Sequence, residues 1–158
     1  MMTFRSILIA FALAACSGAA AATLPPDAVI LPGRQGAVLL DQCSRSTPDA
    51  GEGSWTPAPA DIAALESALP GALQTQEAGR GLGRAPDGWR RQYVGLVRGG
   101  RRYVYGSFFP ADMARHEQDP DRWRREPVIV CDGGPDFFGV EYEVEAGRFT
   151  HFGFNGSA

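Results

Sequence analysis

Three side chains near the C-terminal end of the chain could take part in acid–base or metal chemistry. Asp132 and Asp136 lie four residues apart in one polar segment, and His151 follows fifteen residues later. Two carboxylates and an imidazole could bind a metal ion or transfer protons in a small hydrolase. The alternating acids and closing glutamate of a calcium-binding loop are absent, however. The glycines and aspartates of this segment favour a tight connection between two strands instead.

Other catalytic and cofactor-binding patterns are missing from the sequence. His116 lacks the second histidine of a zinc-protease helix, and we expect it at the surface. No serine lies in a G-x-S-x-G elbow, and the glycine-rich segment 79–83 does not follow a strand as a phosphate loop does. We therefore expect no metal, no cofactor and no enzymatic activity. A small periplasmic hydrolase that uses Asp132, Asp136 and His151 is the alternative.

The first 22 residues have the composition of an export signal. Arg5 is followed by an uncharged apolar run over 7–15, and small residues fill positions 17–22. This run is shorter than the ~20 residues that a membrane-spanning helix requires. Cleavage after Ala22, at an A-x-A pattern, would release a soluble periplasmic protein. The mature chain is therefore expected outside the cytoplasm.

A second cleavage site lies at Leu13-Ala14-Ala15-Cys16. These four residues resemble the lipobox of bacterial lipoproteins, in which the cysteine is lipidated and becomes the new N-terminus. The resemblance implies a membrane anchor at Cys16, and Ser17 after it is typical of outer-membrane lipoproteins in Gram-negative bacteria. The sequence leaves cleavage before Cys16 and cleavage after Ala22 as two alternatives. Residues 23–37 are rich in Ala, Pro and Gly and are expected to form an extended tether.

Either cleavage leaves Cys43 and Cys131 as the cysteines of the mature chain. Two thiols in an oxidising compartment predict one disulfide. It would close a loop of 88 residues, which the chain-entropy estimate values at ~4.5 kcal/mol. Two free buried thiols are the alternative.

The charges are unevenly distributed along the chain. The net charge is −3 and all 15 basic residues are arginines; residues 80–125 hold eleven of them against five acids, whereas both flanks are acidic. Such a block could bind an anionic ligand or an acidic face of an envelope protein. Alternatively, the basic strands pair with the acidic ones within a single sheet. Export and the acidic total disfavour nucleic acid as a partner. The candidate binding surface is Arg90, Arg91, Arg98, Arg101 and Arg102.

Residues 38–158 are expected to form a single α+β domain in which one helix packs on a four- to five-stranded antiparallel sheet. A helix is predicted from Thr56-Pro57 to Pro70-Gly71, with Ile62, Leu65 and Leu69 on its apolar face. Gly99-Gly100 and Ala146-Gly147 each predict a two-residue hairpin. The second hairpin would place Glu145 opposite Arg148 and His151 opposite Tyr142. The remaining predicted elements are strands at 38–41 and 127–131 and a helical turn at 110–118.

This order of elements resembles the cystatin-like arrangement, in which an antiparallel sheet wraps one helix; the likeness is topological and implies no function. Residues 130–142, together with Phe154-Asn155-Gly156, resemble the C-terminal end of small exported bacterial proteins and imply no activity either. The leading hypothesis is a non-enzymatic binding module of the cell envelope, with an unknown envelope protein or an anionic ligand as partner. It would reach the membrane through a lipid anchor if Cys16 is modified.

Overall fold

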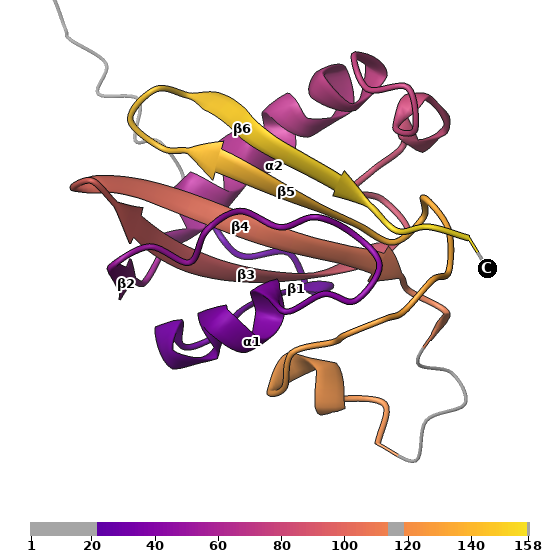
Figure 1. Ribbon diagram of the computed structural model, residues 1–158, viewed down its shortest axis with the longest axis horizontal. Coiled ribbons are helices and arrows are strands. Elements are labelled where there is room, and N and C mark those ends of the chain that lie inside the picture. Colours follow the sequence, from indigo (N-terminus) through magenta and orange to yellow (C-terminus); the bar gives the residue numbers. More distant parts are fainter. Residues whose placement is uncertain (1–21, 114–118, 158) are drawn as a thin grey trace, which may run out of the picture.

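The computed structural model describes residues 22–113 and 119–157, which form a mixed six-stranded sheet with helices on both faces. The strands follow the order β1-β3-β4-β5-β6, and β2 pairs with the same edge of β3 as β1. In Figure 1, α2 lies behind this sheet and α1 in front of it. The elements are β1 (Ala28–Ile30), η1 (Gly33–Gln35), α1 (Gly36–Leu40), β2 (Gly53–Trp55), α2 (Pro59–Gln74), η2 (Arg80–Leu82), β3 (Trp89–Arg98), β4 (Arg101–Pro110), η4 (Arg122–Arg124), β5 (Phe138–Glu143) and β6 (Arg148–Phe154).

The α+β class is confirmed, but the prediction of a purely antiparallel sheet is wrong. Strand β1 runs parallel to β3, with Ala28 opposite Arg91. The prediction of an extended tether over 23–37 is also wrong from residue 28 onward, because β1 begins there and pairs with β3. Leu31 is buried, and its N–H donates to the Tyr93 carbonyl at 2.8 Å. The apolar run 28–31 therefore belongs to the core, and the folded domain begins before residue 38.

The strand predicted at 38–41 is also wrong, because these residues belong largely to α1. Gly36, Leu39 and Leu40 are buried, whereas Val38 is exposed. Burial at positions i, i+3 and i+4 is the spacing of a helix, not of a strand. The apolar run was too short for its period to distinguish the two.

Helix α2 begins two residues after its predicted first turn at Pro57 and extends beyond its predicted end at Pro70-Gly71. It begins at Pro59, where the Asp61 carboxylate accepts the Ala58 N–H at 2.7 Å. It continues through Pro70 to Gln74, and Leu73 is fully buried together with Ile62, Leu65 and Leu69. Proline within a helix costs about 3 kcal/mol. Burying a leucine side chain contributes about 1.5–3 kcal/mol, so core packing supports the last turn.

The first hairpin is confirmed in its predicted form. Arg98 pairs with Arg101 across Gly99 and Gly100, whose φ angles are 54° and 72°. Both positions thus lie in the left-handed region, where glycine carries no steric cost. This turn sets the register of two ten-residue strands, the longest in the sheet.

The second hairpin forms with a different register from the predicted one. Glu143, not Glu145, lies opposite Arg148, so residues 144–147 make the turn. A bulge near Thr150 then shifts the pairing, and His151 lies opposite Glu141 instead of Tyr142. A bulge adds one residue to a strand and moves every later side chain to the other face.

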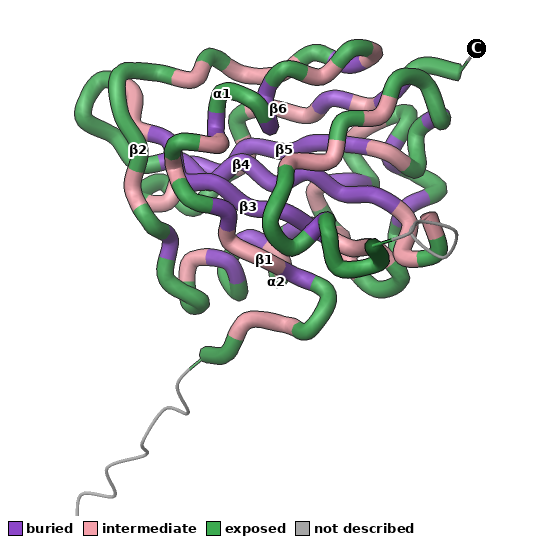
Figure 2. The backbone as a smooth tube through the Cα atoms, turned by 90° about the horizontal axis from the view of Figure 1, so that it is seen from below, coloured by how far each residue is buried: buried purple, intermediate pink, exposed green. Residues whose placement is uncertain are grey.

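Two apolar clusters cover the two faces of the sheet. The α2 face contains the buried leucines of α2 with Tyr93, Phe108 and Phe138. The α1 face contains Leu39 and Leu40 with a second group of sheet residues that includes Val94 and Tyr105. Both faces of the sheet are therefore covered, and Figure 2 shows the buried strands between exposed outer segments.

The strand predicted at 127–131, in the connection between β4 and β5, is also wrong. Residues 127–131 have no strand structure. The Gln92 side chain holds this segment instead: its Nε2 donates to the Trp123 and Glu126 carbonyls, and its Oε1 accepts the Val128 N–H. The predicted helical turn at 110–118 lies partly outside the described residues, since 114–118 are not among them.

Candidate functional site

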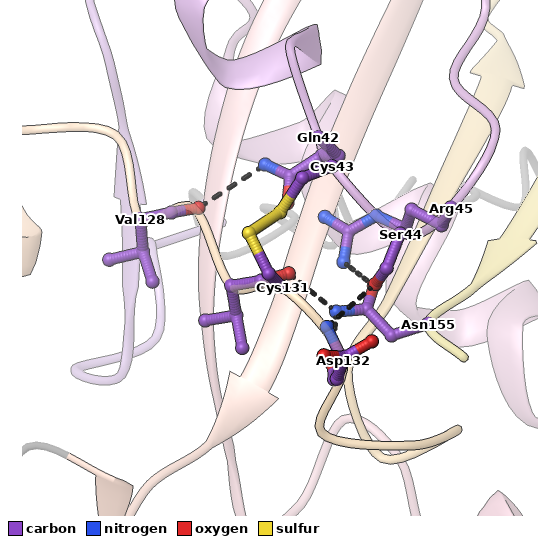
Figure 3. Close-up of a disulfide and its surroundings, with 9 residues drawn as sticks. Gln42, Cys43, Ser44, Arg45, Val128, Cys131, Asp132 and Asn155 are labelled. Carbon is purple, nitrogen blue, oxygen red and sulfur yellow. Dashed lines mark hydrogen bonds between the residues drawn. A yellow bond between two sulfur atoms is a disulfide. The ribbon is translucent and has the colours of Figure 1, made fainter. Parts of the chain in front are cut away.

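The predicted disulfide is present and joins two irregular segments on the α1 side of the sheet. Cys43 and Cys131 are bonded with their Cα atoms 5.2 Å apart, and both residues are exposed. Figure 3 shows the surrounding side chains, which we call the disulfide junction: Cys43, Ser44, Arg45, Cys131, Asp132 and Asn155. The junction holds the β4–β5 connection against the segment that follows α1.

Asn155 links three parts of the disulfide junction. Its Nδ2 donates to the Val130 carbonyl at 2.8 Å and to the Asp132 carbonyl at 2.7 Å. Its Oδ1 accepts a hydrogen bond from Arg45 Nη1 at 2.9 Å. These bonds give both the Nδ2 and the Oδ1 of this buried amide hydrogen-bond partners, as buried polar groups require. Asn155 therefore has a structural role, since it ties the segment 130–132 to Arg45.

Arg45 is a buried cation in the disulfide junction with neutral partners. Its Nη2 donates to Ser107 Oγ at 2.8 Å and its Nη1 donates to Asn155, whereas its Nε has no partner among the described residues. In the described part of the chain no carboxylate pairs with it. Nearby, burial raises the pKa of Tyr105, while the positive charge of Arg45 acts in the opposite direction.

Asp132, Asp136 and His151 occupy different surroundings. Asp132 has a φ of 67° and donates its N–H to Ser44 Oγ at 3.0 Å, whereas His151 Nε2 lies 3.0 Å from the Ser46 carbonyl. Asp136 lies against Trp89, whose Nε1 donates to the Asp136 carbonyl at 2.7 Å. Within residues 22–113 and 119–157, no three or more His, Cys, Asp or Glu side chains are grouped as a metal site. His116 falls outside the described residues.

The five arginines of the candidate binding surface are largely engaged within the molecule. Arg91 is buried and pairs with Glu66 of α2 at 2.9 Å. Arg98 Nη1 donates to Glu141 at 2.6 Å, Arg101 pairs with Glu143 at 2.9 Å, and Arg102 pairs with Glu145 at 2.6 Å. Arg90 lies over the Trp123 ring. The basic strands thus do pair with acidic residues of the same sheet, and Arg101 and Arg102 remain exposed at the hairpin.

Three of the charged groups in these pairs have shifted pKa values. The hydrogen bond to Glu141 raises the pKa of Arg98. Burial alone would lower the pKa of Arg91, but the hydrogen bond and negative charge of Glu66 raise it overall. The exposed Glu145 has a lowered pKa because it accepts a hydrogen bond from Arg102. All three shifts favour the charged forms of Arg98, Arg91 and Glu145.

A surface pocket of ≈ 340 Å³ brings together residues that the sequence did not connect. We call it the Trp89 pocket; it is lined by Arg84, Asp87, Gly88, Trp89, Pro110 and Asp136. The lining comes from the loop before β3, the end of β4 and the β4–β5 connection. Of these lining residues, Asp136 is the one among the predicted acid–base candidates. The other segments meet there because β3 pairs with β4 over its full length, which sets Trp89 opposite Pro110.

A second pocket of ≈ 330 Å³ lies beside η4, with Trp123, Pro127, Val128 and Ile129 among its lining residues. Ile129 is one of the two exposed large apolar side chains in the described ranges, and Val38 of α1 is the other. Scattered exposed apolar residues are normal at protein surfaces. This pocket also adjoins the end of the first described range at Met113.

Comparison of the chain with family models, curated proteins and solved structures gives no match. None of the helices in the described ranges combines the length and apolar character that crossing a membrane requires.

Proposed function

We propose that this protein is an exported, non-enzymatic binding module of the bacterial cell envelope, anchored by lipid at Cys16. The observation that carries the proposal is the Cys43–Cys131 disulfide. Both cysteines are exposed, and disulfides of this kind persist in oxidising compartments and are rare in the cytosol. Together with the export-signal pattern of residues 1–22, the bond favours a mature chain outside the cytoplasm.

The surroundings of the acidic residues support binding rather than catalysis. The buried carboxylates Glu141 and Glu143 are held by arginines, and the half-buried Glu66 pairs with Arg91. The oxygens of these carboxylates are therefore bonded to arginines of the same molecule. Asp132 and His151 use backbone and side-chain contacts of the disulfide junction and its neighbour Ser46. These roles stabilise the fold.

The exposed end of the first hairpin is the surface that we propose for an acidic envelope partner. The side chains of Arg101 and Arg102 are 62% and 48% exposed, so their pairs with Glu143 and Glu145 leave part of each guanidinium open. Arg102 also lies over the Trp55 ring at 4.8 Å. Exposed ion pairs are weak, so an acidic partner could compete for these arginines.

Photo-crosslinking in cells that export the full chain tests this surface. A photo-reactive amino acid replaces Glu52, whose carboxylate accepts the Gly100 N–H beside the hairpin. We expect a discrete crosslinked species that Arg101→Gln/Arg102→Gln reduces several-fold. Arg34→Gln changes an exposed arginine elsewhere and serves as the control. Equal crosslinking by both variants would mean that the basic hairpin is only a paired strand end.

The hydrolase alternative is tested by substitution of its proposed residues. Asp132→Asn or His151→Ala would abolish a cellular phenotype without changing stability if these side chains were catalytic. We expect instead that Asp132→Asn leaves both the phenotype and the stability unchanged, because only its backbone N–H contacts Ser44. Any loss of function in His151→Ala should follow a loss of stability, because its Nε2 contacts the Ser46 carbonyl. Urea unfolding of each variant beside the phenotype separates the two outcomes.

A further inference from the structure

We propose that the Trp89 pocket binds a saccharide, with Trp89 as the stacking surface and Arg84, Asp87 and Asp136 as hydrogen-bonding groups. The inference goes beyond the proposed function, because it assigns a second site and a neutral ligand class to the envelope module, and it rests on the export of that module. It rests on the charge pattern, the rigid indole and the size of the pocket.

The charged side chains of the pocket are unpaired. No ion pair or side-chain hydrogen bond within residues 22–113 and 119–157 engages Arg84, Asp87 or the Asp136 carboxylate. Elsewhere in the same molecule arginines such as Arg91, Arg98 and Arg148 are bonded to carboxylates. An arginine and two aspartates that line one pocket without pairing keep their donors and acceptors available to a ligand.

The indole of Trp89 is fixed by contacts behind it. Its Nε1 donates to the Asp136 carbonyl at 2.7 Å, and its ring meets Phe138 edge-on with centroids 6.3 Å apart. Phe138 in turn stacks on Phe108 in the core. Trp89 is only half-buried, so part of the ring stays open on the pocket wall. A rigid aromatic surface binds apolar groups with little loss of side-chain entropy.

The mixture of charges selects a neutral ligand rich in hydroxyl groups. An anion would approach two carboxylates, and a cation would approach the Arg84 guanidinium; each is opposed by Coulomb repulsion. Sugar hydroxyls both donate and accept, so they can bond to Asp87 and Asp136 and accept from Arg84. The C–H face of a sugar ring is apolar and matches the indole. A saccharide can thus contact the three charged side chains and the indole of the pocket.

The dimensions of the pocket limit the ligand to one or two rings. Its volume of ≈ 340 Å³ lies near the lower end of the ~300–1,000 Å³ typical of ligand pockets. The site is shallow and open to solvent. We therefore expect binding in the millimolar range, equivalent to about −4 kcal/mol at 1 mM.

The test is saturation-transfer NMR and calorimetry on the processed, disulfide-bonded protein from the envelope fraction. The probes are glucose, galactose, mannose and N-acetylglucosamine, with inorganic phosphate and ethylammonium as the charged alternatives. We expect saturable binding of at least one sugar. Asp136→Asn and Arg84→Gln should each weaken it about tenfold, as the loss of about 1.4 kcal/mol does.

Matched controls come from neighbours outside the pocket. Asp132→Asn changes the other aspartate of the same connection, and Arg80→Gln changes an exposed arginine of the same loop. Both should bind the sugar like the unaltered protein. Binding that Asp136→Asn and Asp132→Asn reduce equally, or binding of phosphate or ethylammonium without any sugar, would overturn the saccharide assignment. So would the absence of any saturable binding.

Failure of this inference can be told apart from failure of the proposed function. A protein that crosslinks in the envelope but binds no saccharide retains the module and loses only the pocket assignment. A disaccharide of the sugar that binds tests the non-enzymatic role, because water can cleave its glycosidic bond. Cleavage would produce a new anomeric NMR signal, which would support the pocket and contradict the non-enzymatic role.

Discussion

The carboxylates of β5 show how single residues hold the α1 face of the sheet together. Glu141 and Glu143 are 1% and 2% exposed, and charged groups are almost never buried to this degree unless they are paired. Glu141 accepts hydrogen bonds from Arg98 and from Thr150 Oγ1 at 2.7 Å. The bulge near Thr150 thus places a hydroxyl group beside the carboxylate.

Removing the charge of Glu141 should therefore destabilise the protein markedly. We expect Glu141→Gln to lower the free energy of unfolding by about 3 kcal/mol, because breaking one partner of a buried pair leaves the other charge uncompensated. Glu145→Gln changes an exposed pair and should leave stability unchanged within error. Urea unfolding at neutral pH measures both variants, and equal stabilities would contradict the role assigned to Glu141.

Tyr105 presents the opposite situation. Its buried hydroxyl has no hydrogen-bond partner among the residues that the structure describes, and such a group loses its hydration with no compensating bond. We expect Tyr105→Phe to raise the free energy of unfolding by about 1 kcal/mol at neutral pH. Val104→Ala, which removes apolar groups from the next residue, should lower it. A destabilised Tyr105→Phe protein would show that the hydroxyl is bonded in solution.

The buried tyrosines also predict how stability depends on alkaline pH. Burial raises the pKa of Tyr93 well above its ordinary value, with the charge of Glu66 acting in the same direction, and burial raises the pKa of Tyr105 as well. The unfolded chain then loses these protons first, near pH 10. Their contribution is full below about pH 10 and declines as the pH rises towards the folded-state values. Chemical unfolding between pH 8 and 11 should show this decline, and Tyr105→Phe should reduce it.

At the scale of elements, local signals succeeded where one residue type determines the backbone. The glycine pair 99–100 fixed the first hairpin, because few other residues adopt positive φ at two successive positions. Local sequence signals gave wrong predictions where tertiary packing determines the structure. Pro70 predicted the end of α2, yet Leu73 lies in the core three residues later. The bulge near Thr150 has no local signature in the sequence either.

The last turn of α2 can be tested directly. Leu73→Ala should lower the free energy of unfolding by about 3 kcal/mol, because it opens a cavity in the core. Gln74→Ala, at the exposed next position, should change it by less than ~0.5 kcal/mol. Had the helix ended at Pro70, the two substitutions would have similar effects.

At the scale of the whole molecule, the sequence predicted the class of fold and the disulfide but not the candidate site. Cys43 and Cys131 could be paired by counting, since few cysteines were available. The lining of the Trp89 pocket comes from three separate segments that only the tertiary fold brings together, and Asp136 is the member that the sequence marks as an acid–base candidate. The cystatin-like arrangement stays a prediction at the level of topology, and the parallel strand β1 departs from it.

The disulfide should contribute strongly to the stability of the whole domain. The double variant Cys43→Ser/Cys131→Ser removes the closure of a loop with a sequence separation of 88. We expect a decrease of up to ~4.5 kcal/mol in the free energy of unfolding, measured without reductant. Ser44→Ala leaves the bond intact and removes one hydrogen bond in the same junction, so it should cost about 1 kcal/mol.

The central claim is that a disulfide-bonded binding module is exported and anchored in the envelope. The intact mass of the native protein, taken without reductant from separated membrane and soluble fractions, tests it most directly. We predict a membrane species that starts at an acylated Cys16 and is two hydrogens lighter than its dithiol form. A protein in the cytosolic fraction that still carries residues 1–15, with Cys43 and Cys131 as free thiols, would contradict the claim.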